Sequence, residues 1–288
     1  MTTKMLFVHA LTPLHAGIGA GTDVIDLPIA REVSTGIPYL PGSSIKGTLR
    51  GHVAKSDRNM ASRMFGPDTR NASDYAGAMQ FSDAYLVAMP IRSLAGMFAW
   101  VTSPYLLRRL QRDANDTAIS NLSVNAVPLQ SVALTTESKL RLGNTQRVVF
   151  EDIELQVVAD TNEIRWTANV DAWAEKIATA TNIEPAFVKE RFCIVSDDVL
   201  SFLLRTATEV RARVRLNDDK TVQTNALWYE ESLPTESILA GVVNVVPNAR
   251  TEFSVEQMFH ALAPVANSLV QFGGKTTTGH GFCRIKIS

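Results

Sequence analysis

The sequence contains few cysteines, no long apolar run and almost no excess of charge. Cys193 and Cys283 are its two cysteines, and they stand far apart outside any CxxC pair. This predicts two buried thiols and indicates neither a disulfide framework nor a cysteine-based zinc site. No apolar stretch approaches the roughly 20 residues that span a bilayer, and the N-terminus lacks the pattern of a signal peptide. We therefore expect a cytoplasmic protein with no membrane partner.

The charge of the chain is balanced overall but unevenly placed. A net charge of −1 argues against a protein that coats nucleic acid without specificity, because such proteins carry a large basic excess. At 288 residues, of which 45% are hydrophobic, the chain is long enough to bury a large core. Any nucleic-acid site must be local, since the cations gather in short groups: Lys46 and Arg50; Arg108, Arg109 and Arg112; Arg211, Arg213 and Arg215; Lys275, Arg284 and Lys286.

The distribution of apolar residues predicts an α+β fold. Strands are predicted at 4–11, near 78–91, near 148–158 and in EVRARVRL, which the turn NDDK joins to a return strand ending in ALWYEE. Helices are predicted from an N-cap at Ser43 or Ser44 to about Lys55, over 104–113, after an N-cap at Ser196, and over about 254–271. Helices and strands do not alternate regularly, which favours one domain with long insertions over a doubly wound sheet.

Several familiar motifs fail on their spacing. The third glycine of GIGAG at 17–21 comes one position too early for a dinucleotide loop, and no helix pattern follows. GGKT at 273–276 lacks the first glycine of a P-loop, and a strand pattern follows it. The five histidines show no HxxxH or HExxH spacing and no serine lies in GxSxG, so metalloprotease and hydrolase functions lack support.

Lys46 and Arg50 share one face of the first predicted helix, with Gly47 and Gly51 beside them. A glycine costs about 1 kcal/mol in a helix interior, so the pair suggests that a partner approaches the backbone closely. A phosphate backbone would need both the room and the charge. The alternative is a solvated basic face whose glycines pack against a neighbouring element.

Arg211, Arg213 and Arg215 project from one face of a strand at intervals of about 7 Å. An extended RNA backbone could follow this repeat. The alternative is an edge strand protected by charge, in which the arginines pair with Glu209, Glu230 or Glu231.

Asp26 is a carboxylate among the apolar residues of VIDLPI, close in sequence to His15 and to a glycine-rich segment. RNA cleavage needs such an acid on an exposed loop, because the 2′-hydroxyl must lose its proton while negative charge develops. The alternative is a turn residue that bonds its own backbone.

Segments along nearly the whole chain, in order, closely resemble the backbone subunit of type III-B (Cmr-type) CRISPR effector complexes, a member of the RAMP superfamily. These segments are IDLPIAREVSTGIPYLPGSSIKGTLR, FSDAYLVAMPIRSLAGMFAWVTSP, RVVFEDIEL, VSDDVLSFL, ATEVRARVRL, ALWYEESLP and QFGGKTTTGHGFCRI. The combination of PGSSIKGTLR with the C-terminal glycine loop is typical of RAMP proteins, and FAWVTSP with LWYEESLP narrows the resemblance to this subgroup.

The resemblance implies a single RAMP domain over residues 1–288. Its palm would be RRM-like (ferredoxin-like), with a finger-like insertion at about 56–150 and a β-hairpin thumb within 205–231. Copies would stack into a helical filament on a CRISPR guide RNA, with other subunits of an antiviral ribonucleoprotein complex and a complementary target RNA as further partners.

The resemblance also assigns residues. Lys46 and Arg50 would grip the guide, and the glycine loop with Gly273, Gly274, Lys275, Gly279 and Gly281 would lie against its backbone. Asp26 matches the loop aspartate that cuts target RNA at regular intervals with a divalent metal, Mg or Mn. His15 and, within LWYEE, Tyr229 with Glu230 or Glu231 resemble further residues near the cleavage site.

The leading hypothesis is thus a metal-dependent endoribonuclease acting within the assembled complex. Asp26 would assist attack of the 2′-hydroxyl on the adjacent phosphate, leaving a cyclic phosphate and a free 5′-hydroxyl. Two alternatives stay open: a non-catalytic RNA-binding scaffold, against which an intact Asp26 argues, and a guide-processing RAMP endoribonuclease that uses His15 as a metal-independent base.

Overall fold

The computed structural model describes residues 2–19, 21, 24–67, 74–114, 119, 121–246, 253–266 and 268–288. It contains one large sheet of twelve strands and a separate two-stranded ribbon. Helices pack around the large sheet, so the predicted α+β class is confirmed. No helix within the described residues is long and apolar enough to cross a membrane.

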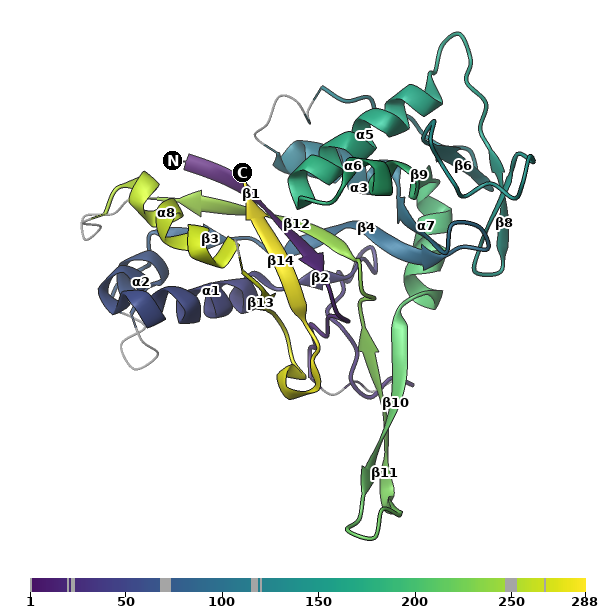
Figure 1. Ribbon diagram of the computed structural model, residues 1–288. Helices are drawn as coiled ribbons and strands as arrows, with labels where there is room; N and C mark the ends of the chain where they lie inside the picture. Colours follow the sequence, from purple (N-terminus) through teal and green to yellow (C-terminus); the bar gives the residue numbers. More distant parts are fainter. Residues whose placement is uncertain are drawn as a thin grey trace.

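The large sheet has two halves (Figure 1). The first half joins the two ends of the chain, because the first and last long strands pair antiparallel. It comprises β13 (Val270–Gln271), β14 (Phe282–Ile287), β1 (Thr2–Ala10), β12 (Ile238–Val245) and β4 (Ala84–Arg92), with β2 (Tyr39–Leu40) and β3 (Met79–Phe81) at its side. The second half continues with β5 (Phe98–Thr102), β9 (Phe192–Val195), β6 (Ser131–Leu134), β8 (Ile153–Val157) and β7 (Arg147–Phe150).

The helices gather beside these two halves (Figure 1). Beside the first half lie α1 (Gly42–Ser56), α2 (Arg58–Phe65) and α8 (Val255–Ala266). Around the second lie α3 (Pro104–Asp113), α5 (Trp166–Thr181), α6 (Pro185–Lys189) and α7 (Asp197–Thr206). A short 3-10 turn, η2 (Thr276–Thr278), lies within the C-terminal glycine loop.

Strand β1 is buried on both faces, as its alternating sequence predicts. Leu6 and Val8 belong to a core that α1, α2 and α8 complete, whereas Met5 and Phe7 belong to a second core with Trp100 of β5 and the apolar face of α5. Burial of more than 20 side chains on each side makes this strand the centre of the domain.

The two thiols are buried, as predicted. Cys193 and Cys283 are both free and belong to the same core as Leu6 and Val8. Burial raises the pKa of both thiols, because the thiolate would lose its hydration there.

Some of the predicted helix boundaries agree with the structure and others do not. Helix α3 spans the predicted residues, and the Ser196 hydroxyl caps α7 by accepting from the Val199 N–H. The predicted N-cap of α1 at Ser43 or Ser44 is wrong, because the helix begins at Gly42, whose N–H donates to the Asp83 carboxylate at 2.7 Å.

The last helix is shorter than predicted. It ends at Ala266, and Val270 and Gln271 pair with β14 as the edge strand β13. Pairing with a strand that lies beyond the glycine loop therefore replaces the last turn of the expected helix.

The ribbon consists of β10 (Glu209–Leu216) and β11 (Val222–Ser232) and projects from the body of the protein (Figure 1). Its register sets Arg211 opposite Glu230, so one face is charged. The other face carries exposed apolar side chains at Val210, Val214, Leu216, Val222, Leu227 and Tyr229. EVRARVRL, the NDDK turn and the return strand are confirmed as a hairpin.

Candidate active site and basic surfaces

Asp26 lies on an exposed loop that runs along the inner end of β11. The Leu27 N–H donates to the Tyr229 carbonyl at 3.0 Å, and the Leu27 carbonyl accepts from the Glu231 N–H at 3.0 Å. The Asp26 Oδ2 atom accepts from the Tyr229 N–H at 2.7 Å, across 203 positions of sequence. Among the described residues, the Asp26 side chain thus bonds a distant strand and not its own turn, which argues against the alternative drawn from the sequence. Within the described residues, Oδ1 has no hydrogen bond and stays open to a ligand.

Glu231 points into the body of the protein and holds the loop beyond Asp26. Its carboxylate accepts from the Arg31 guanidinium at 2.6 Å, from the Thr208 hydroxyl at 2.8 Å and from the Ile29 N–H at 3.1 Å. The carboxylate is buried, so these three donors replace its hydration. Glu231 is thus a fixed anchor in this arrangement.

Glu230 lies on the opposite side of the strand in an ionic cluster. It accepts from the Lys275 ammonium at 2.6 Å, from the Trp228 indole at 2.7 Å and from the Arg213 guanidinium at 3.3 Å. Burial raises the pKa of this carboxyl, but the bonds from Lys275 and Trp228 and the nearby cations outweigh burial and lower the pKa to about 2. Glu230 is therefore ionised at neutral pH, a state unsuited to delivering a proton.

His15 is buried directly beneath the glycine loop. Its Nδ1 lies 2.6 Å from the Glu231 carbonyl, which can only accept, so Nδ1 carries the proton of this bond. The His15 carbonyl accepts from the Gly274 N–H at 2.9 Å. A Cβ atom at Gly17 would lie 2.5 Å from Nε2, so glycine is needed beside the ring.

The structure thus brings the five predicted cleavage-site residues together at the inner end of the ribbon. Asp26 and Tyr229 are exposed there, whereas His15, Glu230 and Glu231 are buried. Lys275 joins the group through Glu230. The exposed pair can contact a substrate, and the buried three can hold that pair in place.

The glycine loop combines exposed and buried positions. Gly273 and Gly274 are exposed and lie over the His15 backbone, where a Cβ at Gly273 would come within 2.3 Å of a carbonyl oxygen. Gly279 has a positive φ of 79° and open space around its Cα. Gly281 is buried against the Phe272 carbonyl, so it offers no surface of its own.

Helix α1, which carries Lys46 and Arg50, contacts the segment just before this loop. The Thr48 hydroxyl, on the opposite side of the helix from these two cations, lies 3.5 Å from the Gln271 carbonyl. A Cβ at Gly47 or Gly51 would meet no atom of the described residues within 4 Å, so these glycines do not pack against a neighbouring element. One part of the alternative drawn for this helix is therefore wrong.

A hollow of about 570 Å³ opens beside the same helix. Lys46 and Arg50 line it together with Tyr75, Gln80 and Phe81. Arg50 also donates to the Pro67 carbonyl at 2.8 Å. Cations and aromatic rings around one hollow are the side chains that nucleotides contact in many proteins.

The three arginines of β10 differ in their partners. Arg211 pairs with Glu209, and Arg213 bonds Glu230 and lies 3.3 Å from Nε2 of the buried His280. Burial and these two arginines lower the pKa of His280, which keeps its ring neutral. Charge pairing, the alternative drawn from the sequence, thus accounts for Arg211 and Arg213. Arg215 makes no ion pair with the described residues.

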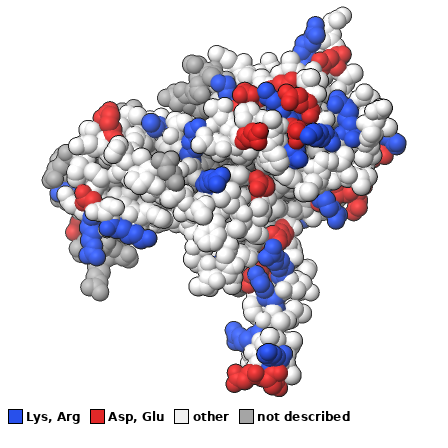
Figure 2. Space-filling model, viewed as in Figure 1, with Lys and Arg blue, Asp and Glu red and all other residues white. Residues whose placement is uncertain are grey.

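The distribution of charge agrees with local basic surfaces on a neutral chain. Figure 2 shows Lys and Arg side chains near α1 and α2 and along the ribbon, whereas acidic side chains lie at the ribbon tip. The turn at that tip contains Asp218 and Asp219 next to Lys220. The two acidic residues make the tip a weaker contact for phosphate than the arginines along β10.

The described residues supply few ligands for a metal ion. They contain no group of three or more His, Cys, Asp and Glu side chains that could hold one. Asp26 is an exposed carboxylate with one oxygen already bonded to Tyr229. Magnesium is commonly held by one or two carboxylates together with substrate phosphates and water, and Asp26 fits only that kind of site.

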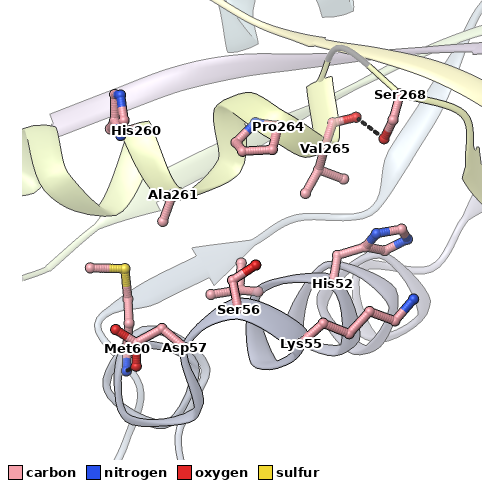
Figure 3. Close-up of a pocket in the computed structure, with 11 residues that line it drawn as sticks. His52, Lys55, Ser56, Asp57, Met60, His260, Ala261, Pro264, Val265 and Ser268 are labelled. Atoms are coloured by element: carbon pink, nitrogen blue, oxygen red, sulfur yellow. Dashed lines mark hydrogen bonds between the residues drawn. The ribbon is translucent and has the colours of Figure 1, made fainter.

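A second cavity, of about 350 Å³, lies between α1, the start of α2 and α8 (Figure 3). His52, Met60 and His260 are among its lining residues. Burial lowers the pKa of His52, and the charge of Lys55 lowers it further. None of the predicted site residues lines this cavity, so it is separate from the group around Asp26.

The sequence matches one protein family over almost its full length. The profile of the RAMP superfamily matches residues 7–284. The chain belongs to the RAMP superfamily. Among RAMP proteins, the CRISPR system Cmr endoribonuclease Cmr4 of Pyrococcus furiosus is 32% identical over 292 residues, covering 100% of this chain and 96% of the relative. The CRISPR system CMR subunit Cmr4 of Saccharolobus solfataricus is 22% identical, with 98% and 96% covered.

Solved RAMP structures share the fold. The crystal structure of oligomeric Cmr4 from Pyrococcus furiosus matches with a TM-score of 0.76 at 25% identity, covering 100% of this chain and 98% of that one. A subunit in the cryo-EM structure of the Type III-B Cmr-beta bound to cognate target RNA matches with a TM-score of 0.74 at 22% identity, covering 100% and 97%. The second similarity concerns the fold alone.

Sequence reasoning missed several residues that build the site. Arg31, Thr208 and Trp228 all bond the carboxylates of β11. Arg31 and Glu231 are 200 positions apart, and no spacing rule relates them. Trp228 directly precedes Tyr229 and could have been noticed as an indole that needs a partner when buried.

Proposed function

We propose that this RAMP protein is the guide-RNA-binding backbone subunit of a type III-B CRISPR effector complex and cleaves complementary target RNA at regular intervals. The observation that carries the proposal is the position of Asp26, an exposed carboxylate bonded to the inner end of the projecting ribbon. The relationship to Cmr4 of Pyrococcus furiosus supports the same function.

The ribbon would be the thumb of the domain, the twelve-stranded sheet would include an RRM-like palm, and residues of about 56–150 would form the finger-like insertion. The exposed apolar face of the ribbon suits contact with the flat faces of RNA bases, because apolar side chains offer nothing that binds a phosphate. Guide phosphates would contact Lys46, Arg50 and the exposed glycines, and Arg215 is the arginine of β10 best placed to join them.

The chemistry assigned to Asp26 is general base catalysis. Its free Oδ1 would take the proton of a 2′-hydroxyl while the 2′-oxygen bonds the adjacent phosphorus and the bond to the 5′-oxygen breaks. The leaving 5′-oxygen takes a proton from water, which leaves a cyclic phosphate and a free 5′-hydroxyl. Tyr229, exposed beside Asp26, would contact the strained RNA, whereas His15, Glu230 and Glu231 would hold the site.

A divalent ion, Mg or Mn, would be held by RNA phosphates and water, and Asp26 would contact it through one of those waters, because its free Oδ1 is needed as the base. When bound, such an ion supplies positive charge next to the reacting phosphate. Asp26 and the backbone of Tyr229 would fix where the carboxylate meets the RNA.

Asp26→Asn tests the proposal, because it removes the charge at nearly constant size. We expect the variant to assemble and to bind target RNA like the wild type while periodic cleavage is lost. A chelator should also stop wild-type cleavage, whereas a metal-independent guide-processing enzyme would be insensitive to it. Full activity of Asp26→Asn would remove the catalytic assignment and leave the scaffold function.

A further inference from the structure

Few contacts of the described residues hold the Asp26 loop against the ribbon. Backbone bonds close the loop on itself: the Gly21 N–H donates to the Asp26 carbonyl at 2.7 Å, and the Ala30 N–H donates to the Ala16 carbonyl at 2.8 Å. Among the described residues, the loop meets β11 through one parallel bridge, between Leu27 and Glu230, and through the bond from the Tyr229 N–H to the Asp26 carboxylate. An isolated pairing of this size is weak, so further side-chain contacts are needed to hold the loop in place on β11.

Arg31, at the end of this loop, ties three elements together. Its Nη2 donates to Glu231 at 2.6 Å and to the Leu204 carbonyl at 3.0 Å, and its Nη1 donates to the Gly36 carbonyl at 2.8 Å. Leu204 lies in the last turn of α7, where carbonyls lack helical partners and attract cations. The guanidinium thus joins the ribbon, α7 and the turn that follows the loop.

Glu231 connects Arg31 to the loop that carries Asp26. One of its oxygens binds Arg31 and Thr208, and the other accepts from the Ile29 N–H at 3.1 Å. Ile29 lies three residues after Asp26. Because the Glu231 side chain is only 4% exposed, its position is set by these partners and by little else.

We propose that Arg31 is a positioning residue for RNA cleavage, which keeps the Asp26 loop in register with β11 through Glu231. This inference rests on the proposed function, since it assigns Arg31 a role only in cleavage by Asp26. Arg31 reaches the site through other residues and does not contact the RNA. Its contribution is a fixed geometry, and a displacement of about 1 Å can cost roughly 100-fold in rate.

The geometry requires arginine at this position. Two nitrogens of one planar group serve three acceptors on different elements, and an ammonium cannot match that fork. Arg31→Lys should therefore keep the ion pair with Glu231 but lose the hydrogen bond to at least one of the two carbonyls. We expect it to cleave at a rate between those of the wild type and Arg31→Ala.

The test uses the assembled complex with guide RNA and a complementary target. Single-turnover cleavage is measured at saturating target, and the target Kd is measured separately in the Asp26→Asn background. We expect Arg31→Ala to lower the cleavage rate at least about tenfold and to change the Kd less than about twofold. Glu231→Gln, which keeps the shape of the side chain, should likewise lower the cleavage rate and leave the target Kd nearly unchanged. Arg92→Ala, which breaks the exposed pair with Glu151, is the matched control and should change neither quantity.

The outcomes separate the two proposals. If Arg31→Ala cleaves target RNA like the wild type while the separate variant Asp26→Asn is inactive, the positioning role of Arg31 is overturned and the catalytic role of Asp26 is kept. An equal loss of assembly, binding and cleavage in both Arg31→Ala and Glu231→Gln would reduce Arg31 to a folding residue. Normal cleavage by Asp26→Asn would end both proposals.

Discussion

Glu230 offers a quantitative test of the ionic cluster at the base of the ribbon. Lowering of its pKa from 4.5 to about 2 corresponds to about 3 kcal/mol of stability at neutral pH. Glu230→Gln removes the charge but keeps an acceptor for Trp228, so the expected loss at pH 7 is about 2 to 3 kcal/mol. Lys275 and Arg213 lose their shared partner in the variant.

The pH dependence has a defined sign. Because the folded-state pKa lies below the unfolded one, the contribution is complete above about pH 5 and is lost as the pH falls from about 4.5 toward 2. Between pH 7 and pH 4, the difference between wild type and variant should shrink by about 0.8 kcal/mol.

Urea unfolding of the free subunit at pH 7, 5 and 4 measures this difference. Glu154→Gln is the control, because the Glu154 pair with Arg147 is about half exposed and should contribute little at any pH. A difference for Glu230→Gln that stays constant, or that grows as the pH falls, would refute the reasoning.

Two further predictions concern RNA binding. The double variant Lys46→Ala, Arg50→Ala should weaken guide binding for all sequences. The slope of log K for guide binding against log salt concentration should become shallower by up to about two, whereas Arg147→Ala should leave this slope unchanged. An unchanged slope in the double variant would make this helix an ordinary solvated face. Subunits should also stack head to tail on RNA, so native mass measurement should find more copies on longer RNAs. A fixed stoichiometry on every length would exclude the filament.

Local patterns sufficed where a few neighbouring residues determine the structure. Pro104 and the apolar spacing after it define α3, and Ser196 with two acidic residues behind it defines the start of α7. The alternation of EVRARVRL defines β10 without reference to the rest of the chain. In each case, residues within a few positions of one another in the sequence determine the element.

Long-range contacts explain what was missed. The start of α1 depends on Asp83, which lies 41 residues away. No local sequence pattern predicts a helix at α5, because it has no side-chain N-cap and depends on packing of Trp173 into the second core. The exposure of Asp26 was foreseen, but the burial of Glu230 and Glu231 was not, because their partners Lys275 and Arg31 are distant in sequence.

The ribbon responds differently to change in its length and in its register. Residues added in pairs, one to each strand next to the turn at 217–220, lengthen the ribbon and leave every pairing at its base unaltered. A slip of one residue between the strands would instead turn Tyr229 into the ionic cluster and Glu230 onto the apolar face. The ribbon can therefore tolerate a change of length at its tip, whereas a change of register at its base would remove both the ionic cluster and the apolar face.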